Sequence, residues 1–171
     1  MVNRAPVLTL WAAVVAERLG FQKDEALTLG RAVAGLNAYS KGVRLGIYQP
    51  TPEAEKERRR KAREGETLHI DLLHRAVPVV QTPDGLRAMS GERPISPESV
   101  ARYLEGKFSG NLARVRAAME RLARSMPPDE LGPRAYRLYE QFRPEIPEGV
   151  TGWGAKGELH LERIAELGAH P

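Results

Sequence analysis

The sequence lacks cysteine altogether, which excludes disulfide bonds and thiolate metal sites. It also lacks a long apolar run. The most apolar stretch, VLTLWAAVVA at residues 7–16, has ten residues, whereas a membrane-spanning helix needs about twenty. We therefore expect no contact with a membrane, and both absences fit a cytoplasmic location.

The apolar stretch could open a signal peptide, because it follows Arg4, but its periodicity favours a core helix. Leu8, Trp11, Val15 and Leu19 fall on one helical face. That face continues past charged residues at positions 17 and 18, which is typical of a folded domain rather than of a signal peptide.

Apolar and charged residues make up 42% and 28% of the 171 residues, as in ordinary globular proteins. A chain of this length can bury a sizeable core and corresponds to about one domain. We predict a single domain over residues 1–171. The alternative is a subdivision into an N-terminal helical pair (1–50), a charged connector helix (51–66), and a hairpin followed by helices (67–171).

Helical periodicity dominates the chain and predicts a mainly α, α+β fold, a compact helical domain of about six helices with one small β-hairpin near 77–90. The expected helices lie near 7–19, near 23–39 with a break at Gly42, from the cap Ser96-Pro97 onwards, over 111–126, from PPDE to Phe142, and within ELHLERIAEL.

The hairpin is placed by the turn residues Pro83, Asp84 and Gly85. Pro78 lacks an amide hydrogen, so its strand is expected at a sheet edge. TLHIDLL, residues 67–73, fits either a strand or the start of a helix.

Arginine outnumbers lysine by 20 to 6, and the formal net charge is +4. Arginine suits phosphate recognition, although a GC-rich genome or a thermophile's composition gives the same bias. The charge is spread evenly, with 6 basic against 3 acidic side chains in residues 1–50, 9 against 9 in 51–100 and 11 against 10 in 101–171. Even EKERRRKARE pairs opposite charges four residues apart, so we expect an exposed helix or a mobile connector there.

A glycine-rich loop, GVTGWGAKGE at residues 149–158, contains the spacing G-x-G-x-x-G in Gly152, Gly154 and Gly157, with Lys156 inside it. A dinucleotide-binding loop follows a strand and precedes an acid by about 20 residues. Here a proline-bounded segment precedes the loop and 14 residues follow it, and the residue after Lys156 does not fit a P-loop. Two interpretations remain, an anion-binding loop at the start of a helix or a turn that inserts Trp153 into the core.

Other candidate sites are weaker. His69, Asp71 and His74 are close in sequence, but neither a strand nor a helix brings the three side chains together, so we predict no metal site. No nucleophile motif is present, and the helical carboxylates have arginines at ion-pair spacing. We expect no catalytic residue and no cofactor, and we favour a non-enzymatic protein.

The segment VAERLGFQKDEALTLGRA, residues 15–32, has small residues at Ala16 and Gly20, as a helix-turn-helix unit does. Asp24 and Glu25 would begin its recognition helix and would repel phosphate. A plain helical hairpin is the favoured interpretation.

TLWAAVVAERLGFQKDEALTLGRAVAGLNAYSKGVRLGI, residues 9–47, and FRPEIPEGVTGWGAKGEL, residues 142–159, resemble a family of bacterial conserved-hypothetical proteins. The resemblance covers most of the chain and has no activity attached to it. It implies a bacterial, intracellular origin and nothing about fold, site or cofactor.

The leading functional hypothesis comes from the helix at 111–126. An apolar seam must face inward and leaves the arginines at the solvent side or flank; its members are Leu112, Val115, Met119, Leu122 and Met126. Two further cations lie in a glycine-punctuated loop with few acids nearby. We predict that DNA or RNA phosphates are bound, with little sequence preference, by Lys41, Arg44, Arg114, Arg121 and Arg124.

Other interpretations stay open. The arginines of this helix could form a solvated face neutralised by Glu120. The protein could be a protein-interaction or regulatory module that forms homo-oligomers or binds a protein partner. It could also be an enzyme that acts on a phosphorylated small molecule through the 149–157 loop.

Overall fold

The computed structural model describes residues 2–44, 68–147 and 155–169, and for residues 39–44 it describes the backbone alone. Two helices open the chain, α1 (Arg4–Arg18) and α2 (Lys23–Arg44). The tight turn between them uses Gly20 at a φ of +114°, a conformation that other residues rarely adopt. The helical hairpin favoured from the sequence is therefore present. Residues 26–30 of α2 are buried against α1 and the sheet, whereas Lys23 and Asp24 at the start of the helix are exposed.

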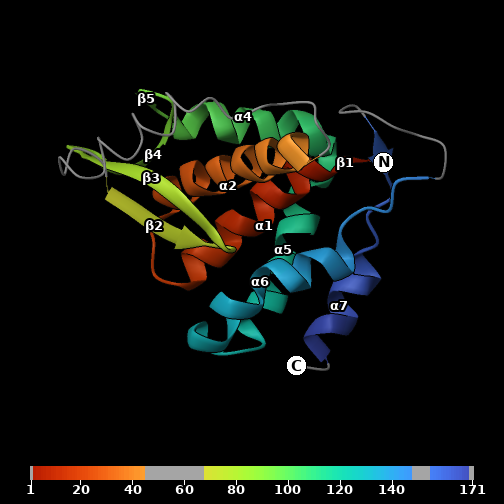
Figure 1. Ribbon diagram of the computed structural model, residues 1–171. Coiled ribbons are helices and arrows are strands. Elements are labelled where there is room, and N and C mark those ends of the chain that lie inside the picture. The colour runs from red at the N-terminus through yellow and green to blue at the C-terminus, as the bar shows by residue number, and fades with distance from the viewer. Residues whose placement is uncertain (1, 45–67, 148–154, 170–171) are drawn as a thin grey trace.

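Helix α1 is buried on every side rather than on one face. All residues from Pro6 to Ala16 are buried, since α2 and α4 pack on one side of the helix and α5 and α6 on the other (Figure 1). Among the described residues, none of the helices combines the length and apolarity that crossing a membrane requires.

A four-stranded antiparallel sheet follows, in the order β2-β3-β4-β5. Its strands are β2 (Leu68–Leu72), β3 (Arg75–Thr82), β4 (Gly85–Ser90) and β5 (Arg93–Pro94). Alternation along the strands buries Val77, Val79 and Ala88, and α2 packs against β3 and β4.

The second half of the chain is helical: α4 (Pro97–Phe108), the 3₁₀ turn η1 (Ser109–Asn111), α5 (Leu112–Arg124), α6 (Pro128–Phe142) and α7 (Leu161–Ala169). The predicted start of α4 is confirmed, because the Ser96 hydroxyl accepts a hydrogen bond from the Ser99 amide at 3.3 Å and Pro97 is the first helical residue.

A short antiparallel pairing joins the N-terminal strand to the segment that precedes α7. β1 (Val2–Asn3) pairs with β6 (Lys156–Gly157), and the Asn3 side chain donates to the Ala155 carbonyl at 3.1 Å. The guanidinium of Arg4 donates to the Pro144 carbonyl at 2.8 Å. These bonds tie the N-terminus to the segment that leads into α7.

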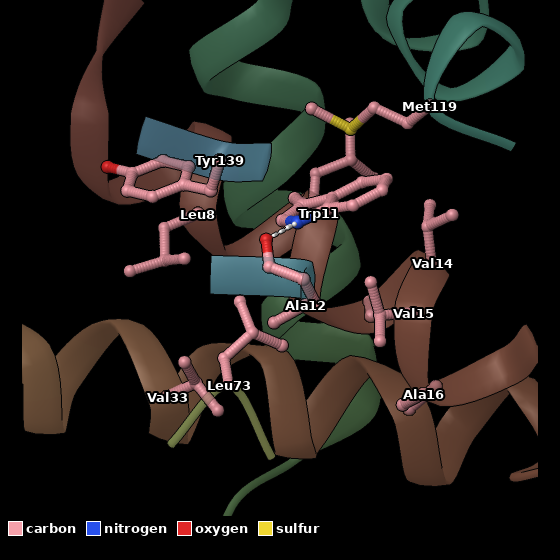
Figure 2. Close-up of a cluster of buried hydrophobic side chains, with 14 of the residues drawn as sticks. Leu8, Trp11, Ala12, Val14, Val15, Ala16, Val33, Leu73, Met119 and Tyr139 are labelled. Atoms are coloured by element: carbon pink, nitrogen blue, oxygen red, sulfur yellow. Dashed lines mark hydrogen bonds between the residues drawn. The ribbon is translucent and has the colours of Figure 1, made fainter. Parts of the chain in front are cut away.

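The core is organised around Trp11, which is completely buried in the middle of α1. Its indole N–H donates to the Ala135 carbonyl of α6 at 2.8 Å, and its ring contacts Phe142 edge-on with 5.3 Å between centroids. Figure 2 shows Trp11 beside Met119 of α5 and Tyr139 of α6. One indole therefore links three helices.

The predicted helix-rich α+β class is confirmed, but the finer expectation of one small β-hairpin near 77–90 is wrong. The hairpin at 77–90 is the centre of a larger sheet, because β2 and β5 flank it, and β1 and β6 form a second sheet. The ambiguous segment 67–73 contains strand β2.

Two local predictions are corrected. Pro78 lies in β3, which is an inner strand. Its missing amide hydrogen is tolerated because the pairing of β3 with β4 ends at Val79 and Ala88, so Pro78 has no partner residue in β4. Gly42 does not break α2, which continues to Arg44. A glycine inside a helix costs about 1 kcal/mol of helix stability relative to alanine, and the favourable interactions of the rest of α2 offset this cost.

The α1–α2 crossing is close because α2 has a glycine at the contact. A Cβ built on Gly30 would overlap the Thr9 carbonyl oxygen and lie 2.9 Å from the Ala13 nitrogen. Both contacts are backbone atoms of the most buried helix, so they cannot move aside cheaply.

Glu25 joins α2 to the sheet. Its carboxylate accepts hydrogen bonds from the backbone amides of Gln22 at 3.0 Å and Leu86 at 2.9 Å. The hydrogen bond from the Gln22 amide, and to a smaller extent that from the Leu86 amide, lowers the pKa of Glu25 below its usual value.

We expect Gly30→Ala to destabilise the protein by about 3 kcal/mol, because the added methyl forces α1 and α2 apart. Gly35→Ala in the same helix is the matched control. Nothing lies within 4 Å of a Cβ there, and alanine should stabilise the helix by about 0.5–1 kcal/mol. Denaturant unfolding of both variants measures the difference. Equal stabilities would contradict the close crossing.

We expect the stability contribution of Glu25 to depend on pH. Since its folded-state pKa is lowered, the contribution is complete above the carboxyl's ordinary pKa and is lost as the pH falls through the lowered value. The difference in unfolding free energy between wild type and Glu25→Gln should therefore be largest at neutral pH and shrink in acid. A difference that does not change with pH would rule out a stabilising contribution from the ionised Glu25 carboxylate.

Candidate nucleic-acid interface

Helix α5 presents the seam that the sequence predicts. Val115, Met119, Leu122 and, just after the helix, Met126 are buried, while Leu112 is partly buried. The opposite side of α5 is exposed to solvent and carries arginine side chains.

One flank of α5 is neutralised by ion pairs. Arg116 pairs with Glu17 of α1 and, at 3.5 Å, with Glu120. Glu120 also pairs with Arg124 at 3.1 Å. Glu120 therefore neutralises Arg116 and Arg124 in part, as the alternative interpretation of a solvated helix face expects. The pairing with Glu17 connects residues 99 apart in sequence, so helical spacing could not reveal it.

Arg114 and Arg121 lie on the other flank. Both side chains are exposed, and neither has an ion pair with any residue that the structure describes. Seven residues separate them, so they point the same way and lie about 10.5 Å apart along the helix axis. Arg124 is also largely exposed, at 67%.

The structure therefore brings Arg114, Arg121 and Arg124 onto one helix. Lys41 and Arg44 belong to the last turns of α2, not to the predicted loop. Their side chains lie outside the described part of the chain, so no contact with the α5 arginines is assigned.

The sequence did not indicate a second basic cluster around Tyr103 of α4. The Arg31 guanidinium lies 4.4 Å from the centre of its ring, and the Lys107 ammonium lies 6.0 Å away. Burial raises the pKa of Tyr103, against the influence of Arg31. Tyr103 and Lys107 are four residues apart on one helix, so their contact could have been predicted from the sequence. The contact of Arg31 with Tyr103 could not, because it is formed by the packing of α2 against α4.

Arg18 has a structural role. Its guanidinium donates to the carbonyls of Ala123 at 3.3 Å and Met126 at 3.2 Å, and so it satisfies free carbonyl groups at the C-terminal end of α5. No sequence pattern identified this role.

The glycine loop is described only from Ala155 onwards. Gly152, Trp153 and Gly154 lie outside the described residues. Lys156 is exposed and Gly157 is buried, both in strand β6, and α7 begins later, at Leu161. A Cβ on Gly157 would overlap the Glu145 carbonyl oxygen, so close packing alone accounts for this glycine.

The histidine-rich segment lies at the exposed side of the sheet. His69 and Asp71 are exposed on β2, and His74 sits in the β2–β3 turn, 6.4 Å from the Tyr136 ring centre. Tyr136 and Arg75 both donate to the Asn37 side-chain oxygen, at 3.1 and 2.9 Å. This polar contact anchors the turn to α2 and α6.

No family model, curated protein or solved structure matches the chain.

We expect alanine substitutions of the α5 arginines to differ in their effect on the free energy of unfolding. Arg116→Ala should cost about 1 kcal/mol, because it leaves the partly buried Glu17 without its partner. Arg114→Ala and Arg121→Ala should each change stability by less than about 0.5 kcal/mol. Unfolding curves in denaturant measure all three variants. A loss for Arg114→Ala as large as that for Arg116→Ala would show that Arg114 has a structural role.

Proposed function

We propose that this is a non-enzymatic protein that binds DNA or RNA with little sequence preference, and that α5 supplies the contact. The observation that carries the proposal is the exposed pair Arg114 and Arg121, which has no ion-pair partner among the described residues. The neighbouring Arg116 is engaged with Glu17 and Glu120.

The spacing suits a phosphate backbone. Two guanidinium groups that project from one side of a helix, about 10.5 Å apart along its axis, can each bind a phosphate of the same nucleic-acid strand. Guanidinium forks match phosphate oxygens bidentately. The pair between Arg124 and Glu120 is exposed, so it contributes little and can exchange for a phosphate contact.

The low sequence preference follows from assigning the arginines of α5 to phosphates rather than to base edges. The helix sequence, LARVRAAMERLAR, contains no Asn or Gln, the side chains that read adenine edges. Arginine contacts to phosphates position a protein on nucleic acid but carry no sequence information. We place this activity in the cytoplasm of a bacterium.

We expect wild-type protein to bind short DNA and RNA duplexes and single strands with affinities that fall as salt rises. For the Arg114→Ala/Arg121→Ala variant, the slope of log affinity against log salt should be smaller by roughly 1.4–1.8, because about 0.7–0.9 is lost for each contact. Fluorescence anisotropy at several salt concentrations measures both slopes.

The matched control is Arg134→Ala/Arg137→Ala, which removes the same charge from exposed positions of α6. A general effect of net charge would reduce binding equally in both double variants, and that result would contradict a site on α5. Absence of binding at low salt would instead favour the protein-interaction module, and sedimentation of the same sample then tests for a homo-oligomer.

A further inference from the structure

A second feature of α5 has a different chemistry, namely an apolar groove between α5 and α7. The groove has a volume of ≈ 300 Å³, which is at the lower end of the range for small-molecule sites. Ala118 and Leu122 form its α5 wall, and Leu161, Ile164 and Ala165 form its α7 wall. Ile164 is fully buried and Ala165 is exposed, so the groove runs from the core to solvent.

The groove has one charged side chain in its lining, Arg121. This guanidinium is exposed and has no ion pair with the described residues. The nearby carboxylates Glu162 and Glu166 line a separate hollow, together with Arg143 and Arg163. An unpaired cation at the edge of an apolar groove is complementary to a molecule with a hydrocarbon body and a single carboxylate.

We propose that the α5–α7 groove binds an apolar monocarboxylate, with its carboxylate on the Arg121 guanidinium and its hydrocarbon chain between Leu122, Leu161 and Ala165. The proposal does not depend on nucleic-acid binding. Arg121 takes part in both sites, so the ligand would compete with a phosphate for that one residue.

The first experiment titrates the full chain with decanoate below its micelle concentration, by calorimetry. We expect saturable binding of one molecule per chain, with affinity rising about fourfold for each methylene from hexanoate to decanoate, as burial of a methylene predicts. Decanol, which has the same chain but no charge, should bind at least tenfold more weakly. Equal binding of decanol, or no saturation with decanoate, would overturn the proposal.

Variants locate the site. Arg121→Ala should weaken decanoate binding by at least tenfold, the range expected for a charge-assisted hydrogen bond. Arg114→Ala is the matched control, since it removes the same charge from the same flank but does not line the groove, and it should leave decanoate binding unchanged. Equal losses in these two variants would overturn the assignment.

Filling the groove provides an independent test. Ala165 is exposed, so Ala165→Trp and the smaller Ala165→Leu can occupy the groove without entering the core. Both should reduce decanoate affinity, and the tryptophan more strongly, while melting temperature and nucleic-acid binding stay unchanged. Full decanoate binding by both variants would contradict the site. Failure of the nucleic-acid proposal would leave the decanoate and melting-temperature results unaffected.

Discussion

The fold depends on the burial of α1 from all sides. A helix that neighbours surround completely must be apolar around its whole circumference. The run from Pro6 to Ala16 meets this condition except at Thr9, whose hydroxyl donates a hydrogen bond to the Ala5 carbonyl at 2.8 Å. Its neighbours must also come close, and Gly30 of α2 allows this because its Cα lies against the backbone of Thr9 and Ala13. Trp11 then fixes α6 through the hydrogen bond to Ala135. The sheet packs on α2, so its position follows from the same crossing.

Periodicity predicted the helices well because their buried positions recur at helical spacing, as the seam of α5 shows. It failed at the sheet for a specific reason. The β2–β3 turn is formed by Leu73 and His74, both at positive φ (48° and 62°), although such turns usually contain asparagine or glycine. Leu73 is buried there, so core packing offsets the unfavourable backbone. Sequence rules for turns contain no signal for this hairpin.

The candidate site was predictable in the same partial way. The inward seam fixes which arginines of α5 face solvent, so the exposure of Arg114 and Arg121 could be predicted. The engagement of Arg116 could not, because Glu17 comes from another helix. Tertiary contacts use several arginines structurally, as the roles of Arg4 and Arg18 in binding backbone carbonyls show. The even distribution of charge along the sequence thus concealed a flank on which two arginines remain available.

The central claim is that α1 is the element on which the remaining packing depends, and native-state hydrogen exchange of individual amides tests it most directly. Amides in the middle of α1, from Leu8 to Val15, should exchange only through global unfolding and be the slowest in the protein, while those of α7 should exchange through local opening at lower free energy. If the amides of α1 exchange as fast as those of α7, or faster than the buried amides of α6, the account of the fold is wrong.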